Sequence, residues 1–187
     1  MSEQRYNKVA VFLHWAIGIS IILMIALGLV MEDVKPLTLR IDAYNFHKSL
    51  GITVLFLSLF RVYWRFTHPV PALPSGMKSW EVLASKATHI AFYALIIIMP
   101  LSGWLMVSAS GKYPTIFFWL FEMPHLPVTG QKALGKQAYE IHELTTQWIA
   151  IPLIALHMLA ALKHHFFNTD GVLLRMLPRF IAVRLER

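Results

Sequence analysis

The sequence predicts an all-α membrane protein, a four-transmembrane-helix bundle with both termini cytoplasmic. Three observations support this fold class. Hydrophobic residues make up 57% of the 187 residues and charged residues only 14%, against about 45–50% and about 25% in soluble domains. Four long apolar runs follow one another along the chain, and the basic residues gather in alternate connections. We expect one domain over residues 1–187, with helices at 9–31, 48–66, 87–109 and 142–165.

The first apolar run, Val9 to Met31, has the length needed to cross a bilayer, about 20 residues. It is too long for the core of a signal peptide, and no A-x-A-like cleavage site follows it. We therefore predict that this segment stays in the protein as the first helix.

The second run starts near Lys48 and carries Arg61 and Arg65 in its last turns. Arginines at the end of a short span must extend to the membrane surface or face a polar interior. Two arginines one turn apart also suit the carboxylates of a bound ligand. Anchoring of the helix end and ligand contact both stay open for this pair.

The third and fourth runs each contain one proline, Pro100 and Pro152. Prolines are tolerated in membrane helices where neighbouring helices satisfy the freed carbonyl groups. Both runs are therefore predicted to continue through their prolines as spanning helices.

Charge sorts between the two sides of the predicted bundle. The N-terminal tail, the 61–86 connection and the C-terminal tail carry eleven Lys or Arg against four Asp or Glu, whereas the 32–48 and 110–143 connections carry six of each. By the positive-inside rule, both termini are cytoplasmic. The basic residues are scattered and form no nucleic-acid motif, so nucleic acid is excluded as a partner.

Residues 116–121 of the long connection are all aromatic or aliphatic. Such a segment is typical of the aromatic belt at the membrane surface, where it would be half buried. A docking patch for a partner protein is the alternative.

Four histidines are expected at two depths of the bundle: His14, His47, His142 and His157. His142 and His157 are fifteen residues apart, which on an α-helix is about 22 Å of rise and an offset of about 60°. The depths match His14 with His157 and His47 with His142. Because ionisable side chains inside a membrane are costly, four that match in pairs favour ligation of two stacked haem irons and electron transfer across the membrane.

The chain has no cysteine. This excludes disulfides, cysteine-ligated iron–sulfur clusters and covalent C-x-x-C-H haem attachment, so any haem must be held non-covalently. A haem-free transporter or scaffold that uses its histidines for metal or protons is a rival reading, and it predicts no Soret band. No acid–base pair, nucleophile triad or phosphate loop points to hydrolytic or transferase chemistry.

His89 enters the third span at the depth of His14 and could replace it as a ligand. One turn after it comes the bulky Tyr93, whereas small residues that leave space for a macrocycle follow three of the predicted ligands: Gly18, Gly51 and Ala161. We therefore expect His89 to be a hydrogen-bonding or proton-transfer group near the cytoplasmic haem. His164 and His165 follow Lys163 at the end of the last helix, where cations complement the helix dipole.

Five short stretches resemble the bacterial cytochrome b561 family: LHW at 13–15, HKSLG at 47–51, RVYWR at 61–65, ALKHHFF at 161–167 and LLRML at 173–177. The resemblance covers nearly the whole chain, in the same order and with similar spacing. It implies a four-helix inner-membrane protein with two haems b, whose ligand positions fall on His14, His47, His142 and His157.

One member type of that family is a superoxide oxidase, which passes electrons from periplasmic superoxide to ubiquinone. The resemblance thus implies a di-haem oxidoreductase between a periplasmic donor, superoxide as the best candidate, and ubiquinone. The donor would be a small molecule or a periplasmic redox protein. The alternative is a membrane-anchor cytochrome subunit that relays electrons for a partner dehydrogenase or hydrogenase, with 116–121 as the docking surface.

Lys48 and Lys112 are candidates for steering superoxide, because an anion gains from local positive charge. Lys132 and Lys136 could add to this, and solvated loop lysines are the alternative for each. Arg61 and Arg65 are candidates for contacts with haem propionates. The candidates for the quinone site or for residues behind the ligands, chosen by depth alone, are Trp15, Trp64 and His89.

Overall fold

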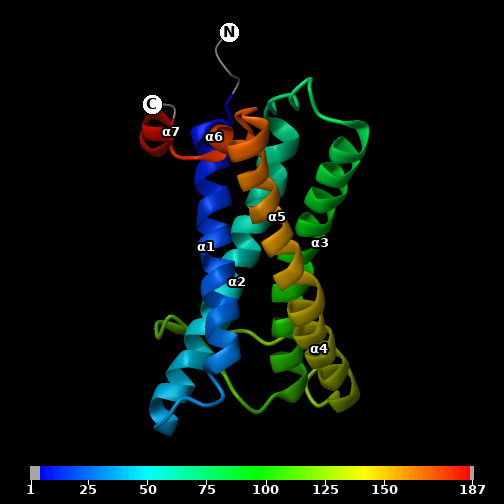
Figure 1. Cartoon of the computed structure of the whole chain (residues 1–187). Coiled ribbons are helices and arrows are strands. Elements are labelled where there is room, and N and C mark those ends of the chain that lie inside the picture. Colours follow the sequence, from blue (N-terminus) through cyan, green and yellow to red (C-terminus); the bar gives the residue numbers. More distant parts are fainter. Residues whose placement is uncertain (1–4, 186–187) are drawn as a thin grey trace.

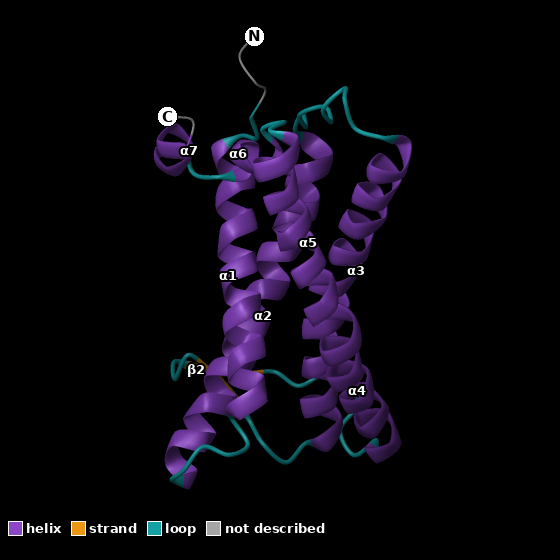
Figure 2. Ribbon diagram, viewed as in Figure 1, coloured by secondary structure: helices purple, strands orange, loops and turns teal. Residues whose placement is uncertain are grey.

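The protein is a bundle of four long helical spans, seen in the computed structural model, which describes residues 5–185 (Figures 1 and 2). The first three spans are α1 (Lys8–Val30), α2 (Leu37–Thr67) and α3 (Ser79–Ser110). The fourth is a run of four pieces: α4 (Lys132–Thr145), η1 (Thr146–Ala150), α5 (Ile151–Lys163) and η2 (His164–Asn168). All four are long and apolar enough to cross a membrane, which confirms the predicted bundle of four membrane-spanning helices.

Three of the spans begin well before the apolar runs that predicted them. The second helix starts at Leu37 and not at 48, the third at Ser79 and not at 87, and the fourth at Lys132 and not at 142. The predicted limits followed hydrophobicity, whereas a helix continues into polar sequence until its backbone is capped. At the start of α3, for example, the Glu81 carboxylate accepts a hydrogen bond from the Lys78 backbone N–H at 3.0 Å.

The centre of the bundle is a small cluster of aliphatic side chains. Ile17, Val54 and Ile96 are buried and bring α1, α2 and α3 together. Many large apolar side chains point outward instead, including Ile19 and Leu156. An apolar exterior around a modest core is what a bilayer, as the surrounding solvent, favours.

The fourth span is not a continuous α-helix. At η1 the Ile151 N–H bonds to the Thr146 carbonyl five residues back, next to Pro152, which has no N–H to donate. Such a π-turn holds about one residue more than an α-turn, so the fifteen residues from His142 to His157 rotate like about fourteen α-helical ones. The angular offset between the two positions is then about 40° in the opposite sense from the expected value, and both still lie on one side of the span.

The two ends of the described chain lie at the same end of the bundle (Figure 1). Two short helices, α6 (Val172–Met176) and α7 (Arg179–Leu185), follow the fourth span there. The Trp15 indole N–H donates to the Met176 carbonyl at 2.8 Å, and Arg5 donates to the Leu177 carbonyl at 2.7 Å. These bonds hold the C-terminal segment against the start of α1.

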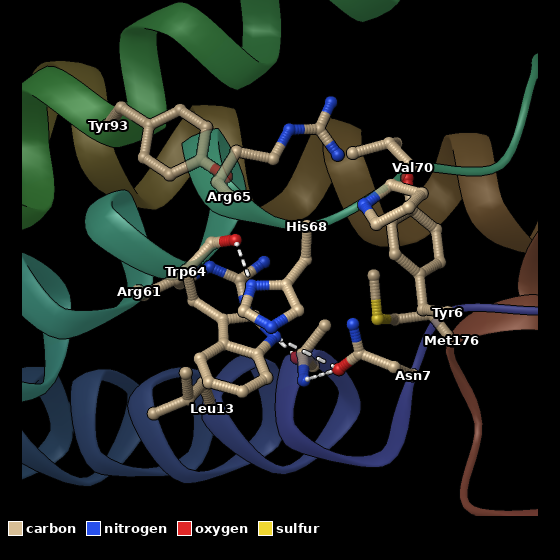
Figure 3. Close-up of a pocket in the computed structure, with 12 residues that line it drawn as sticks. Tyr6, Asn7, Leu13, Arg61, Trp64, Arg65, His68, Val70, Tyr93 and Met176 are labelled. Atoms are coloured by element: carbon tan, nitrogen blue, oxygen red, sulfur yellow. Dashed lines mark hydrogen bonds between the residues drawn. The ribbon is translucent and has the colours of Figure 1, made fainter.

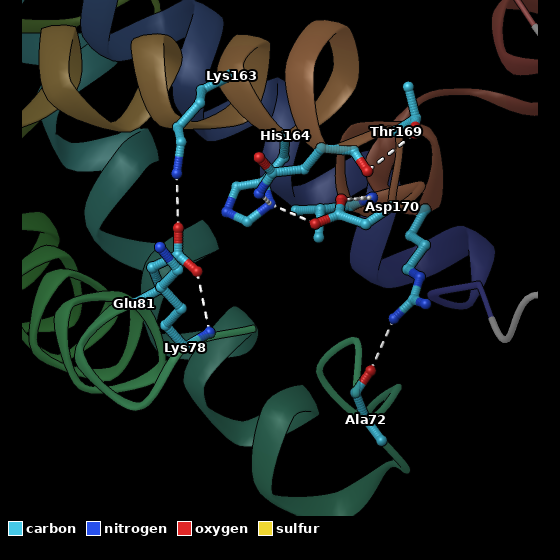
Figure 4. A network of polar contacts seen from close by, with 10 residues as sticks. Ala72, Lys78, Glu81, Lys163, His164, Thr169 and Asp170 are labelled. Atoms are coloured by element: carbon cyan, nitrogen blue, oxygen red, sulfur yellow. Dashed lines mark hydrogen bonds and ion pairs between the residues drawn. The ribbon is translucent and has the colours of Figure 1, made fainter. Parts of the chain in front are cut away.

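Polar contacts close the same end between the third and fourth spans (Figure 4). Lys163 at the end of α5 pairs with Glu81 at the start of α3. His164 is buried and its Nδ1 lies 2.5 Å from the Asp170 carboxylate. His164, at the predicted end of the last helix, is therefore held inside the structure by a carboxylate.

A β-hairpin caps the opposite end of the bundle. Strands β1 (Thr115–Phe117) and β2 (Phe121–Met123) pair antiparallel. Residues 115–118 are buried or half buried, and residues 119–121 are exposed. The inner part of the 116–121 segment thus has the half-buried position typical of an interfacial segment, and its outer part is exposed as a docking patch would be.

The hairpin is fastened to α2. The buried Ser49 Oγ accepts from the Phe118 N–H at 2.9 Å and lies 3.1 Å from the Ile116 carbonyl. The Trp119 indole N–H donates to Asp42 at 3.0 Å. Two of the three turn residues, Phe118 and Trp119, have positive φ angles of 42° and 60°. This conformation is uncommon for bulky residues and persists only where the surroundings enforce it.

Candidate functional site: two pairs of histidines

The folded chain brings the four predicted histidines together as two pairs. The ring centres of His14 and His157 are 6.1 Å apart, and those of His47 and His142 are 6.3 Å apart. Two imidazoles on opposite sides of one metal ion, with metal–nitrogen distances of about 2.0 Å and ring radii of about 1.1 Å, would have centres about 6.2 Å apart. Both pairs therefore have the separation of two imidazoles that share one ion.

The pairs occupy the two ends of the bundle and come from different spans. His14 on α1 faces His157 on α5 at the end that holds both described termini, while His47 on α2 faces His142 on α4 at the hairpin end. Each pair thus draws one side chain from each of two helices, as a site in the centre of a bundle requires.

The donor set suits haem better than a bare metal ion. Within residues 5–185 no cluster of three or more His, Asp or Glu side chains could hold an ion by itself. Two imidazoles alone leave a zinc ion short of its usual four ligands. A haem brings four nitrogen ligands of its own and needs only the two axial positions that a histidine pair offers.

His89 lies beside the His14–His157 pair. Its ring centre is 6.2 Å from that of His157, and its Nδ1 donates to the Ser85 carbonyl at 2.7 Å. The Nδ1 atom of His14, in turn, lies 3.5 Å from the Arg61 guanidinium. His157 therefore has two histidine neighbours at nearly the same separation, His14 and His89.

Arg61, Arg65 and Trp64 line one small cavity next to this pair (Figure 3). Its volume of about 30 Å³ is the share of about one water molecule in liquid water. Arg61 reaches across to α1 and donates to the Ala10 carbonyl at 3.2 Å. Trp64 donates to the Asn7 side chain at 3.0 Å and stacks on His68.

The three residues predicted by depth for a quinone site have different neighbours. Trp64 lines the cavity, His89 lies beside His157, and Trp15 is bonded to the carbonyl of Met176. Depth alone could place them at one end of the bundle, but it could not give their directions around the helix axes.

At the hairpin end, each histidine ring lies against a glycine of a neighbouring helix. A Cβ atom added to Gly103 would lie 3.2 Å from Cε1 of His142, and one added to Gly28 would lie 3.6 Å from Cε1 of His47. The glycines let α3 and α1 approach the rings closely. Sequence reasoning looked for small residues on the histidines' own helices, and therefore missed both.

Of those small residues, Gly18 does border open space, since a Cβ there would meet nothing within 4 Å. Gly51 faces the Met24 sulfur, 3.8 Å from such a Cβ. Of these two glycines, Gly18 is the one beside which the structure leaves the open space predicted for a macrocycle.

Further groups at the hairpin end were also missed. The His142 Nδ1 lies 3.0 Å from the Ser102 hydroxyl and 3.0 Å from the Met99 carbonyl, both on α3. No feature of the sequence links residues 99–102 to His142, because the contact forms only when the helices pack.

The lysines proposed to steer an anion differ in their surroundings. Lys48, next to His47, donates to the Pro114 carbonyl at 2.7 Å and so links α2 to the segment before the hairpin. Lys112 is exposed in that same segment. The structure thus places a fixed cation and a solvent-facing one at the His47–His142 end.

The chain is similar to known proteins over nearly its whole length. A sequence model of the family described as prokaryotic cytochrome b561 matches residues 5–179. Cytochrome b561 homolog 2 of Escherichia coli K12 is 33% identical over 179 residues, which cover 95% of this chain and 94% of that protein. Cytochrome b561 homolog 1 of the same strain is 30% identical, with 94% and 98% covered.

A third relative, the protein named probable superoxide oxidase CybB of Yersinia pestis, is 26% identical over 95% of this chain and 98% of its own length. The similarity in all three cases extends over essentially the whole chain. Together with the four-span bundle, these matches show that the chain belongs to the prokaryotic cytochrome b561 family, integral membrane proteins that carry b-type haem and transport electrons.

Proposed function

We propose that this protein is a di-haem cytochrome that carries electrons across the inner membrane, from a periplasmic donor to ubiquinone, with superoxide as the donor. The observation that carries the proposal is the placing of two histidine pairs, at 6.1 and 6.3 Å, at opposite ends of one bundle. When bound, the haems supply one-electron redox chemistry. A site near each membrane surface is what a relay between two compartments needs.

The side chains proposed as axial ligands are His14 with His157 and His47 with His142. Both pairs use neutral imidazoles in a largely apolar surrounding, where a charged ring would be costly. Arg61 and Arg65, at the first pair, are proposed to bind the propionates of the haem there. His89 is proposed as a hydrogen-bonding or proton-transfer group.

The orientation of the protein follows from its charges. The end with the termini carries most of the basic residues, so we propose that it faces the cytoplasm and that the hairpin end faces the periplasm. On this orientation His47 and His142 would hold the haem nearer the periplasmic donor, and His14 and His157 would hold the haem nearer the quinone.

Lys48 and Lys112 would attract an anionic donor to the periplasmic end, which favours superoxide over a neutral donor. The name of the Yersinia pestis relative supports the same donor. Two superoxide anions would each give up one electron and leave as dioxygen. One ubiquinone would take up the two electrons and two protons at the other site, for which Trp15, Trp64 and His89 are the candidates.

The second candidate function, a membrane-anchor subunit for a partner dehydrogenase or hydrogenase, has one observation in its favour. The side chains of Trp119, Leu120 and Phe121 at the hairpin tip are 54%, 77% and 53% exposed. Exposed aromatic groups held on a fixed turn are suited to docking.

The two functions differ in what the purified protein does by itself. Detergent-purified protein is supplied with an enzymatic source of superoxide and a soluble ubiquinone, and ubiquinol is measured against cytochrome-free controls. We expect superoxide-dependent ubiquinol formation that disappears in His47→Ala and His142→Ala. Ubiquinol formation only after a membrane partner is added would instead support the anchor subunit.

A further inference from the structure

The His142 ring is surrounded on one side by groups of α3. The ring lies against Gly103, and Nδ1 lies 3.0 Å from both the Ser102 hydroxyl oxygen and the Met99 carbonyl oxygen. Ser102 is only 7% exposed and donates its own proton to the Met99 carbonyl at 2.7 Å. These groups form one closed set of hydrogen bonds around a single nitrogen.

This set fixes which nitrogen of His142 carries the proton. A backbone carbonyl can only accept, so the nitrogen next to Met99 must be Nδ1–H. The Ser102 hydroxyl has its proton on the same carbonyl and therefore also accepts from Nδ1–H. In the neutral ring the lone pair is then on Nε2, which is the nitrogen left free for a metal ion.

The opposite ring of the pair is held differently. The Nδ1 atom of His47 is buried and forms no hydrogen bond of ordinary geometry within residues 5–185, and the polar group next to this ring is the backbone of Met24. His142 is therefore the ring of this pair whose Nδ1 has a side-chain hydroxyl as well as a carbonyl beside it.

We propose that Ser102 is a positioning residue that lowers the reduction potential of the haem at the His47–His142 pair. This inference rests on the proposed ligation by that pair. Acceptors on Nδ1–H make the imidazole a stronger donor to iron and so favour the oxidised state. A low potential at the periplasmic end favours onward transfer to the pair at the other end.

The test is a redox titration of purified protein, followed by haem absorbance and by low-temperature electron paramagnetic resonance of the oxidised form. Ser102→Ala should keep two haems per chain and shift one of the two midpoint potentials upward. The midpoint that remains in His47→Ala identifies the other haem, which should not move.

Two further variants separate tuning from a general loss of packing. Ser102→Thr keeps the hydroxyl and should restore the original midpoint. Ser58→Ala removes another fully buried serine, on α2, whose hydroxyl has no partner within the described residues, and it should leave both midpoints unchanged. If Ser102→Ala loses a haem, the same upward shift must appear in Ser102→Cys, whose thiol is a weaker acceptor.

Unchanged midpoints and resonance spectra in Ser102→Ala, or in Ser102→Cys where that variant is needed, would overturn the inference and leave the proposed function intact. Equal shifts of both midpoints, or a shift of equal size in Ser58→Ala, would also overturn it. Failure of the proposed function looks different: wild-type protein would hold fewer than two haems, or His142→Ala would keep both.

Discussion

At the hairpin end, single residues on neighbouring helices leave room for the two histidine rings and fix their positions. The rings of His142 and His47 lie close to Gly103 and Gly28 on neighbouring helices. The spacing of the histidines along the sequence gives no indication of these two glycines. The ligand candidates could be predicted from the sequence because membrane-buried histidines are rare. Their supports could not be, because they are ordinary glycine, serine and backbone groups on other helices.

At this scale we expect Gly103→Ala to reduce haem content at the hairpin end. The added Cβ would lie 3.2 Å from Cε1 of His142, so the ring must shift by a few tenths of an ångström from a tightly hydrogen-bonded position. Haem per chain measured by pyridine haemochrome should fall towards one. Gly76→Ala, in open space on the connection after α2, is the matched control, and equal haem content in both variants would contradict this account of the glycine.

Lys48 gives a second prediction at the residue scale. If its charge steers superoxide, Lys48→Gln should lower the second-order rate of haem reduction by superoxide several-fold, and the difference from wild type should shrink as salt is raised. Stopped-flow absorbance at two ionic strengths measures this. A salt-independent loss would show that the link from Lys48 to the Pro114 carbonyl, and not the charge, is what matters.

Among the elements, the four spans were predictable and their ends and irregularities were not. Hydrophobicity located α1 to within a residue, but it missed the first eleven residues of α2, which are helical and mix charged, polar and apolar side chains. The π-turn at 146–150 was also missed, because a proline in the sequence does not reveal whether the helix bends or takes in an extra residue. The hairpin of residues 115–123 was expected as an aromatic segment at the membrane surface or a docking patch, and its pairing into two strands was not predicted.

The hairpin gives the prediction that belongs to this scale. Replacing Leu120 and Phe121 by serine leaves the bonds from Ser49 and Asp42 to the turn in place, so the fold should be kept. Superoxide-dependent ubiquinol formation should be unchanged if the protein acts alone. A loss of ubiquinol formation in membranes, with full activity of the purified variant, would point to a docked partner.

The orientation of the whole molecule in the membrane is predicted by its charge distribution, and cysteine labelling can test it. Because the chain has no cysteine, a single introduced cysteine reports its own position. In intact cells with a permeabilised outer membrane, a membrane-impermeant thiol reagent should label Gln131→Cys and should reach Gly76→Cys only after lysis. The reverse pattern would place the hairpin end in the cytoplasm and remove the case for a periplasmic donor at His47.

The central claim is that two histidine pairs hold two haems, one near each end of the bundle. The most direct test is haem b per chain in detergent-purified wild type, His14→Ala, His47→Ala and His89→Ala. We predict two haems in the wild type, one in each of the first two variants, and two in His89→Ala. One haem or none in a wild-type preparation that has lost none during extraction would contradict the relay. Retention of both haems in His14→Ala, with loss of one in His89→Ala, would show that His89 is the partner of His157.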